Sequence, residues 1–247
     1  MNEESSFSRR GFLATSAAVS TFIASNACAD QDKPSLKKGD VVLFQGDSIT
    51  DARRDKNRKG ANDPQALGFG YPQHAAGGLL DTHRMLDLKI MNRGISGNKV
   101  PDLKARWQAD ALDLKPAVLS ILIGVNDIWH KLNGRYDGTA EVYRDGFKAL
   151  LAETKKALPD VTLVVCEPFV LRCGAVNANW FPDFDKRRGY AKQVAEESGA
   201  VWVPFQTMFD YAVSLGTAPA YWAGDGVHPS IAGHALMAKT WRAVVGI

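Results

Sequence analysis

Two short segments at opposite ends of the chain carry the three groups that a nucleophilic serine needs. Ser48 lies in the sequence GDSIT of residues 46–50, directly after an apolar run. Near the C-terminus, the sequence DGVH places Asp225 and His228 three residues apart. A serine hydroxyl is a poor nucleophile until a base takes its proton, and the base needs a partner that fixes its tautomer. The order Ser48, Asp225, His228 therefore predicts a hydrolase that attacks an ester carbonyl.

Two segments between these ends could supply the remaining chemistry. The sequence NRGISGN covers residues 92–98 and GVND covers residues 124–127, each at the end of a strand-like apolar run. They can place a backbone N–H and the side-chain amide of Asn126 beside the serine. Such donors stabilise the oxyanion of a tetrahedral intermediate.

These four segments, in this order, resemble the four sequence blocks of the SGNH hydrolases, the superfamily that includes the GDSL esterases. The resemblance extends from about Lys38 to the C-terminus. It implies Ser48 as nucleophile, His228 as base and Asp225 as its orienting partner. It also implies three oxyanion donors, namely the Ser48 N–H, the Gly97 N–H and the Asn126 amide. The chemistry it implies needs no cofactor.

Within that superfamily, residues 94–98, 102–107 and 124–129 look most like those of bacterial acetylxylan esterases and related carbohydrate deacetylases. This likeness implies an acetylated saccharide, or another small ester, as the substrate. Two alternatives remain at this point. One is a lysophospholipase or thioesterase of the same superfamily, and the other is a carbohydrate-binding protein without activity.

Several further residues are candidates for substrate contacts. Trp129 and His130 follow Asn126, Trp180 lies in a later loop, and Trp222 precedes the Asp225 segment. Aromatic rings at a cleft can stack on sugar rings, although packing is the commoner role of tryptophan. The loop of residues 51–59 is rich in Lys and Arg. It is either a solvated loop or a grip on acidic substituents of a polymer.

Composition sets limits on the remaining possibilities. The chain has 247 residues, 45% of them hydrophobic and 23% charged, which fits one globular α/β domain. The net charge of +3 is too small to indicate a nucleic-acid partner. The cysteines have no pair of histidines nearby, so the sequence does not indicate a metal site. After residue 29, no apolar stretch is long enough to span a bilayer. The oligomeric state is left open, homo-oligomers included.

The N-terminus is typical of an export signal. Arg9 and Arg10 precede a modestly apolar stretch and then Ala27-Cys28-Ala29. Paired arginines with a weakly hydrophobic core indicate twin-arginine export, with cleavage after Ala29. We therefore predict a signal peptide at residues 1–29, a single hydrolase domain at residues 30–247, and a periplasmic or secreted protein. Lipidation at Cys28 is the alternative.

Cys166 and Cys173 are the cysteines that remain after cleavage. Export would allow them to form a disulfide, whereas the end of a strand-like run, where Cys166 lies, often holds a buried free thiol. The sequence does not decide between the two states.

The elements that must position these residues alternate between short apolar runs and longer amphipathic segments. We expect strands at residues 41–45, 88–92, 118–123, 161–166 and 200–204, and helices at residues 71–86, 100–113, 139–158, 184–198, 206–214 and 229–245. This alternation indicates a three-layer, doubly wound α/β fold with a buried parallel sheet. The SGNH resemblance implies five strands in the flavodoxin-like order 2-1-3-4-5.

That layout has a consequence for the chemistry. Doubly wound sheets bind their ligands beyond the carboxyl ends of the strands. Ser48 follows the first predicted strand, Gly97 the second and Asn126 the third, while Asp225 and His228 precede the last helix. All five residues are therefore expected to meet at one edge of the sheet.

Overall fold

A parallel sheet of five strands forms the middle of the molecule. The computed structural model describes residues 34–247. The strands are β1 (Val41–Gly46), β2 (Lys89–Asn92), β3 (Val118–Leu122), β4 (Thr162–Cys166) and β5 (Val201–Val203). They lie in the order β2-β1-β3-β4-β5, and every neighbouring pair is parallel. The predicted fold class and strand order are confirmed.

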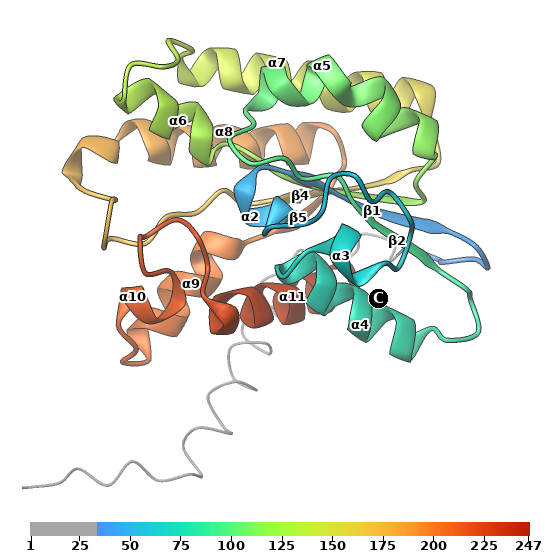
Figure 1. Cartoon of the computed structure of the whole chain (residues 1–247). Helices are drawn as coiled ribbons and strands as arrows, with labels where there is room; N and C mark the ends of the chain where they lie inside the picture. Colours follow the sequence, from blue (N-terminus) through green and yellow to red (C-terminus); the bar gives the residue numbers. More distant parts are fainter. Residues whose placement is uncertain (1–33) are drawn as a thin grey trace, which may run out of the picture.

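Helices cover both faces of the sheet and give three layers (Figure 1). One face carries α5 (Val100–Asp110), α7 (Ala140–Ala157) and α8 (Asp183–Glu197), and the other carries α4 (Tyr71–Thr82), α9 (Phe205–Ser214) and α11 (Ile231–Val245). Each face has its own apolar core. Trp107 and Phe147 are fully buried on the first side, and Phe209 and Trp241 on the second. Burial on both faces explains why the strands read as continuous apolar runs.

Short helices fill several of the loops. They are α2 (Ser48–Asp51), α3 (Pro64–Leu67), α6 (Val125–Leu132), α10 (Pro219–Trp222) and the 3₁₀ turns Leu112–Leu114 and Ala178–Trp180. Most of these helices span a single turn, which is too short to produce a periodic pattern in the sequence. The last helix also begins later than predicted, at Ile231 instead of Pro229. The Ser230 hydroxyl accepts the Gly233 N–H at 3.1 Å and so caps the helix two residues further on.

The state of the two cysteines is now clear. Cys166 and Cys173 are both free thiols. Cys166 is buried 3.5 Å from the Ser120 hydroxyl, and the Cys173 thiol donates to the Ala223 carbonyl at 3.2 Å.

Residues 1–29, for which an export signal is predicted, and the alternative lipidation site Cys28 lie outside the described residues. Among the helices of residues 34–247, none has the length and apolar character needed to cross a membrane.

Candidate active site

Ser48, His228 and Asp225 form one continuous chain of hydrogen bonds. Ser48 Oγ lies 2.8 Å from His228 Nε2, and His228 Nδ1 lies 2.6 Å from Asp225 Oδ2. Because an ionised carboxylate can only accept, Nδ1 carries the ring proton, and Nε2 of the neutral ring is left to accept from the serine hydroxyl. The sequence predicted that these three residues would meet, and the fold brings them together.

The carboxylate of Asp225 holds the histidine loop as well as the ring. Its Oδ1 accepts the backbone N–H groups of Val227 and His228 at 2.9 and 2.7 Å. Burial alone would raise the pKa of Asp225, but the hydrogen bonds from the His228 side chain and from these backbone groups lower it below the ordinary value. Asp225 is therefore an anion at neutral pH, as the tautomer of His228 requires.

The serine is placed by the start of a helix. Asp47 caps α2 by accepting the Ile49 N–H at 3.0 Å, and Ser48 is the first residue of that helix. The Ser48 N–H thus lies among the unpaired amides of a helix N-terminus, where negative charge is favoured. Burial raises the pKa of Asp47 to about 7.

The other two predicted oxyanion donors lie in neighbouring loops. Gly97 follows β2 and has a φ of +82°, a conformation that residues with a side chain adopt rarely. Asn126 lies in the first turn of α6, is 5% exposed, and donates from Nδ2 to the Asn98 carbonyl at 3.2 Å. This bond joins the Asn126 amide to the residue that follows Gly97.

The aromatic ring of Trp129 packs beside His228, with Trp180 behind it. The ring of Trp129 lies 5.9 Å from that of His228 and 5.5 Å from that of Trp180. His130 is half-buried, and a Cβ on Gly97 would lie 3.8 Å from its ring. Trp222 instead donates from Nε1 to Thr217 Oγ1 at 2.7 Å and packs on Phe209 of α9.

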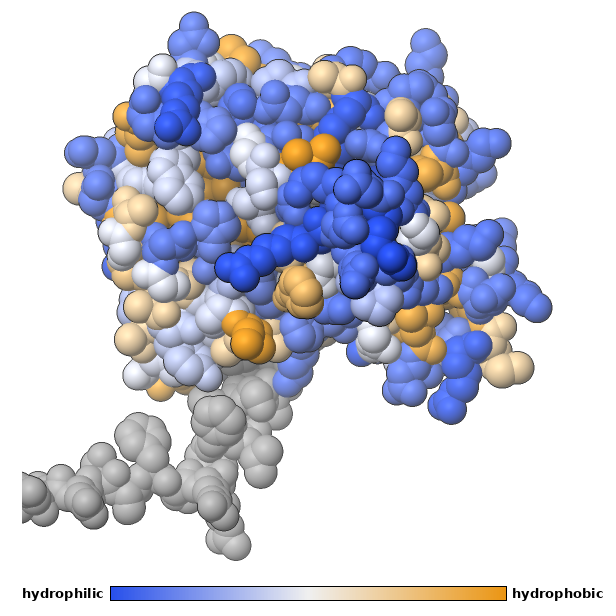
Figure 2. All heavy atoms as spheres, viewed as in Figure 1, coloured by the Kyte–Doolittle hydropathy of each residue, from blue (hydrophilic) through white to orange (hydrophobic). Residues whose placement is uncertain are grey.

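The basic loop after α2 lies at the front of the molecule, where it forms a strongly hydrophilic patch (Figure 2). Several of its charges are engaged within the protein. Lys56 pairs with Asp51 at 2.8 Å, and Arg58 pairs with Asp63 at 2.6 Å. Arg54 is buried and donates from Nε to the Gly94 carbonyl at 2.7 Å. Much of the basic character of this loop therefore serves to anchor it.

Sequence reasoning missed the residues that hold these loops in place. Asn92 donates from Nδ2 to the Thr50 and Leu67 carbonyls, and its Oδ1 accepts the Gly94 N–H at 2.8 Å. Asp51 accepts hydrogen bonds from Ser96. Asn92 lies inside the second sequence block and Asp51 directly follows the first, but only contacts between distant parts of the chain show that they hold these loops in place.

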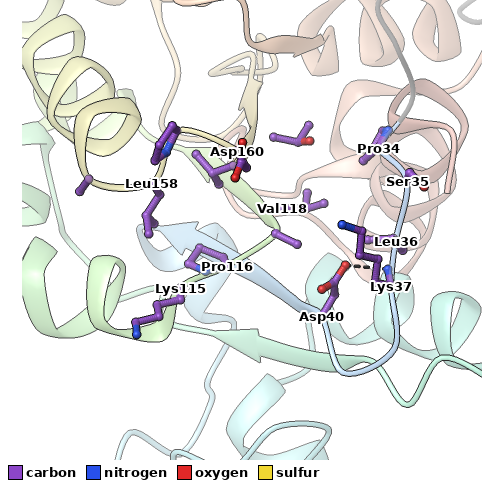
Figure 3. A pocket seen from close by; sticks show the side chains of 15 residues that line it. Pro34, Ser35, Leu36, Lys37, Asp40, Lys115, Pro116, Val118, Leu158 and Asp160 are labelled. Atoms are coloured by element: carbon purple, nitrogen blue, oxygen red, sulfur yellow. Dashed lines mark hydrogen bonds between the residues drawn. The ribbon is translucent and has the colours of Figure 1, made fainter.

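A cavity of about 400 Å³ lies elsewhere, at the amino ends of β1, β3 and β4 (Figure 3). It is lined by residues 34–37, 40, 115–118 and 157–162. Asp40, at its rim, accepts the Lys37 N–H at 2.7 Å. Because parallel strands place their amino and carboxyl ends at opposite edges of the sheet, this cavity is separate from the Ser48 site.

Comparison with known proteins agrees with this geometry. Residues 44–236 match the model of the GDSL-like lipase/acylhydrolase family. The chain belongs to this family. The match spans all four segments of the site, and members of the family are carboxylic ester hydrolases, so this protein is one as well.

Two relatives align along nearly their whole length. The acetylxylan esterase of Geobacillus stearothermophilus is 36% identical over 215 residues, which are 85% of this chain and 96% of the relative. The crystal structure of the acetylxylan esterase Axe2 from that organism superposes with a TM-score of 0.75 at 34% identity, covering 86% of this chain and 96% of the other. Two further Axe2 structures are described as catalytic mutants; one has a serine replaced by alanine and the other a histidine replaced by alanine.

A crystal structure from Parabacteroides merdae, described as that of a GDSL-like lipase, is more similar to this chain than the Axe2 structure is. Its TM-score is 0.84 at 49% identity, and the match covers 87% of this chain and 99% of the other. The three-layer fold and the order of its segments are therefore shared with solved members of the GDSL-like family.

Proposed function

We propose that this protein is an exported serine esterase that removes O-acetyl groups from carbohydrates. The observation that carries the proposal is the hydrogen-bonded chain from Ser48 through His228 to Asp225. The similarity to acetylxylan esterases over most of both chains supports the choice of an acetyl ester of a saccharide as the substrate. The twin arginines at residues 9 and 10 support export.

In the proposed first half-reaction, Ser48 Oγ attacks the acetyl carbon while His228 Nε2 takes the hydroxyl proton. The carbonyl π electrons move onto oxygen, and the N–H groups of Ser48 and Gly97 and the Asn126 amide receive the oxyanion. Asp225 stabilises the imidazolium that forms. Collapse of the intermediate then breaks the ester C–O bond, and the imidazolium protonates the leaving sugar hydroxyl.

The second half-reaction repeats these steps with water. His228 takes a proton from water, which attacks the acetyl-serine, and the proton is then returned to Ser48 Oγ as acetate leaves. Trp129 and His130 are proposed to border the substrate, since the Trp129 ring packs beside His228 and the His130 ring lies beside Gly97. Trp180, also predicted to contact the substrate, is only 2% exposed and instead supports the Trp129 ring from the core. Both half-reactions use only the chain's own groups and water.

Rates across esters of increasing acyl length test the substrate class. We expect 4-nitrophenyl acetate to be cleaved faster than the butyrate, and the octanoate hardly at all, with release of acetate from acetylated xylan and acetylated monosaccharides. Ser48→Ala should abolish each of these activities. Rates that rise steadily with acyl length would instead assign a lipid or thioester substrate.

A further inference from the structure

The loop that carries Gly97 lies directly on the first turn after Ser48. The Ile95 N–H donates to the Gly46 carbonyl at 3.0 Å. Gly94 approaches α2 so closely that a Cβ on it would lie 2.5 Å from the Asp51 nitrogen. The serine and the oxyanion loop are therefore packed backbone against backbone, with no side chain between them at Gly94.

Asp51, the last residue of α2, adds a charged contact between the same two segments. Its carboxylate is completely buried, and its Oδ2 accepts both the Ser96 N–H and the Ser96 hydroxyl at 2.9 Å. The Lys56 ammonium lies 2.8 Å from the same oxygen. Burial alone would raise the pKa of Asp51, but the hydrogen bonds from Lys56 and Ser96 lower it. The side chain therefore accepts as an anion, which makes each bond stronger than a neutral one.

Arg54 holds the other side of this turn. Its side chain is buried, and Nε donates to the Gly94 carbonyl at 2.7 Å. Asp51 and Arg54, three residues apart, thus bind two backbone groups of the oxyanion loop. Asp51 accepts the Ser96 N–H, and Arg54 donates to the Gly94 carbonyl. We call these two side chains the Asp51–Arg54 clamp.

The residue on the far side of Gly97 is held as well. The Asn98 carbonyl accepts the Asn126 amide at 3.2 Å, and Asn98 Oδ1 accepts Arg106 Nε at 2.8 Å. Gly97 therefore lies between Ser96, which is bound by Asp51, and Asn98, which is bound by Asn126 and Arg106. Gly97 has a φ of +82°, and a glycine in a free chain can adopt many other backbone conformations. The direction of the Gly97 N–H therefore depends on how its two neighbours are held.

We propose that the Asp51–Arg54 clamp consists of positioning residues that fix the Gly97 N–H toward the oxyanion formed at Ser48. This inference rests on the proposed roles of Ser48 and Gly97. Its physical basis is that an oxyanion donor accelerates a reaction only when it is oriented before charge develops. A loss of orientation weakens the transition state more than the bound substrate, so the effect should appear in kcat.

The experiment compares Asp51→Ala with Asp63→Ala. Asp63 is a suitable control in the same region of the chain, because its carboxylate also accepts two hydrogen bonds, from the Gln65 and Ala66 N–H groups, and also pairs with a cation, Arg58. With 4-nitrophenyl acetate, Asp51→Ala should lower kcat about 10- to 100-fold with little change in KM, whereas Asp63→Ala should leave both within about twofold.

A boronic acid inhibitor separates positioning from general damage to the fold. Phenylboronic acid bound to the serine resembles the tetrahedral intermediate, so its inhibition constant should rise by the same factor by which kcat falls. Asp51→Asn keeps an acceptor oxygen and should recover part of the loss. If Asp51→Ala retains the kcat of the wild type while its thermal midpoint falls, Asp51 is only structural and the inference is overturned.

Two milder variants keep the test decisive if Asp51→Ala does not fold. Ser96→Ala removes one of the two bonds to Asp51 and should lower kcat a few-fold. Lys56→Met removes the cation at Asp51 Oδ2 and should also lower kcat a few-fold. Unchanged kcat in both variants would reject the clamp.

Labelling by an organophosphate distinguishes this failure from that of the proposed function. If the wild type is labelled at Ser48 and the clamp variants keep their kcat, only the positioning inference is wrong. If Ser48 of the wild type is not labelled and Ser48→Ala is fully active, the proposed mechanism itself is wrong.

Discussion

Asp225 is bound to His228 twice, once at the ring and once at the backbone. Its Oδ2 accepts from Nδ1 at 2.6 Å, while its Oδ1 accepts the His228 N–H at 2.7 Å. One carboxylate thus fixes the tautomer of the ring and the position of the backbone that carries it. The offset of three residues makes this double contact possible, because both residues lie in one turn.

Asp225→Asn should therefore be strongly inactive with its fold intact. An amide can satisfy one of the two contacts as an acceptor, but its NH₂ group facing Nδ1 stabilises the tautomer in which Nε2 carries the proton. That ring cannot accept a proton from Ser48, and we expect kcat to fall by about 10⁴. Steady-state kinetics and circular dichroism check this. Activity above a tenth of the wild-type value would contradict the proposed role of Asp225.

Asn126 is expected to act in the transition state and not in substrate binding. Asn126→Ala removes one oxyanion donor and should lower kcat by about a hundred- to a thousandfold. Asn133→Ala is a suitable control, since Asn133 lies exposed at the other end of the same helix. Kinetics with an acetyl ester measure both. A change confined to KM would place Asn126 in substrate binding instead.

Much of the architecture was predictable because it follows from burial. A strand covered on both faces must be mostly apolar, as Val42 to Phe44 are and as Val118 to Leu122 are apart from the buried Ser120. Amphipathic segments between such strands imply crossovers. The ends of single-turn helices were not predictable in this way. At Ser230, one hydroxyl decides where α11 begins, and the neighbouring Pro229 is an equally reasonable first residue by sequence.

The reacting groups were also easier to predict than the residues that hold them. Ser48, Asp225 and His228 are marked by their types and spacing, whereas Asp51 and Arg54 read as charges of a solvated basic loop. Their partners Ser96 and Gly94 lie some forty residues away in the sequence and meet them only through the pairing of β1 with β2. The sequence around a charged residue does not show that its side chain is buried and bonded to backbone groups far away in the chain.

The proposed export gives a prediction that is independent of the active site. The stretch after Arg9 and Arg10 contains several polar residues, among them Thr15, Ser16 and Ser20, and such low hydrophobicity favours the twin-arginine route. Changing both arginines to lysine should leave an active precursor in the cytoplasm. Mass spectrometry of the exported wild type should find a free N-terminus at Asp30. A diacylglyceryl group on Cys28 would show lipidation, and normal export of the double variant would exclude the twin-arginine route.

His234 gives a prediction for stability as a function of pH. Its ring is 9% exposed, and Nδ1 accepts the Tyr71 N–H at 3.1 Å, so α11 and α4 are joined by a neutral imidazole. Burial lowers the pKa of His234 to about 4, and the nearby His74 and His228 act in the same direction. In the unfolded chain a histidine titrates near its ordinary value of about 6.5. The unfolded state therefore binds this proton first as the pH falls.

The sign of the effect follows from that difference. The contribution of His234 to stability is complete above about pH 6.5, falls as the pH drops from there toward 4, and is lost below it; its size is about 3 kcal/mol. His234→Gln offers Tyr71 an acceptor that does not titrate. Urea unfolding of both proteins between pH 7.5 and 4 should show the wild type losing about 3 kcal/mol relative to the variant. Comparing the two proteins cancels the opposite effect of Asp47 and Asp127, since burial raises the pKa of each to about 7 and so favours the folded state at acid pH. A stability difference that does not change with pH would mean that His234 is not held neutral by its burial.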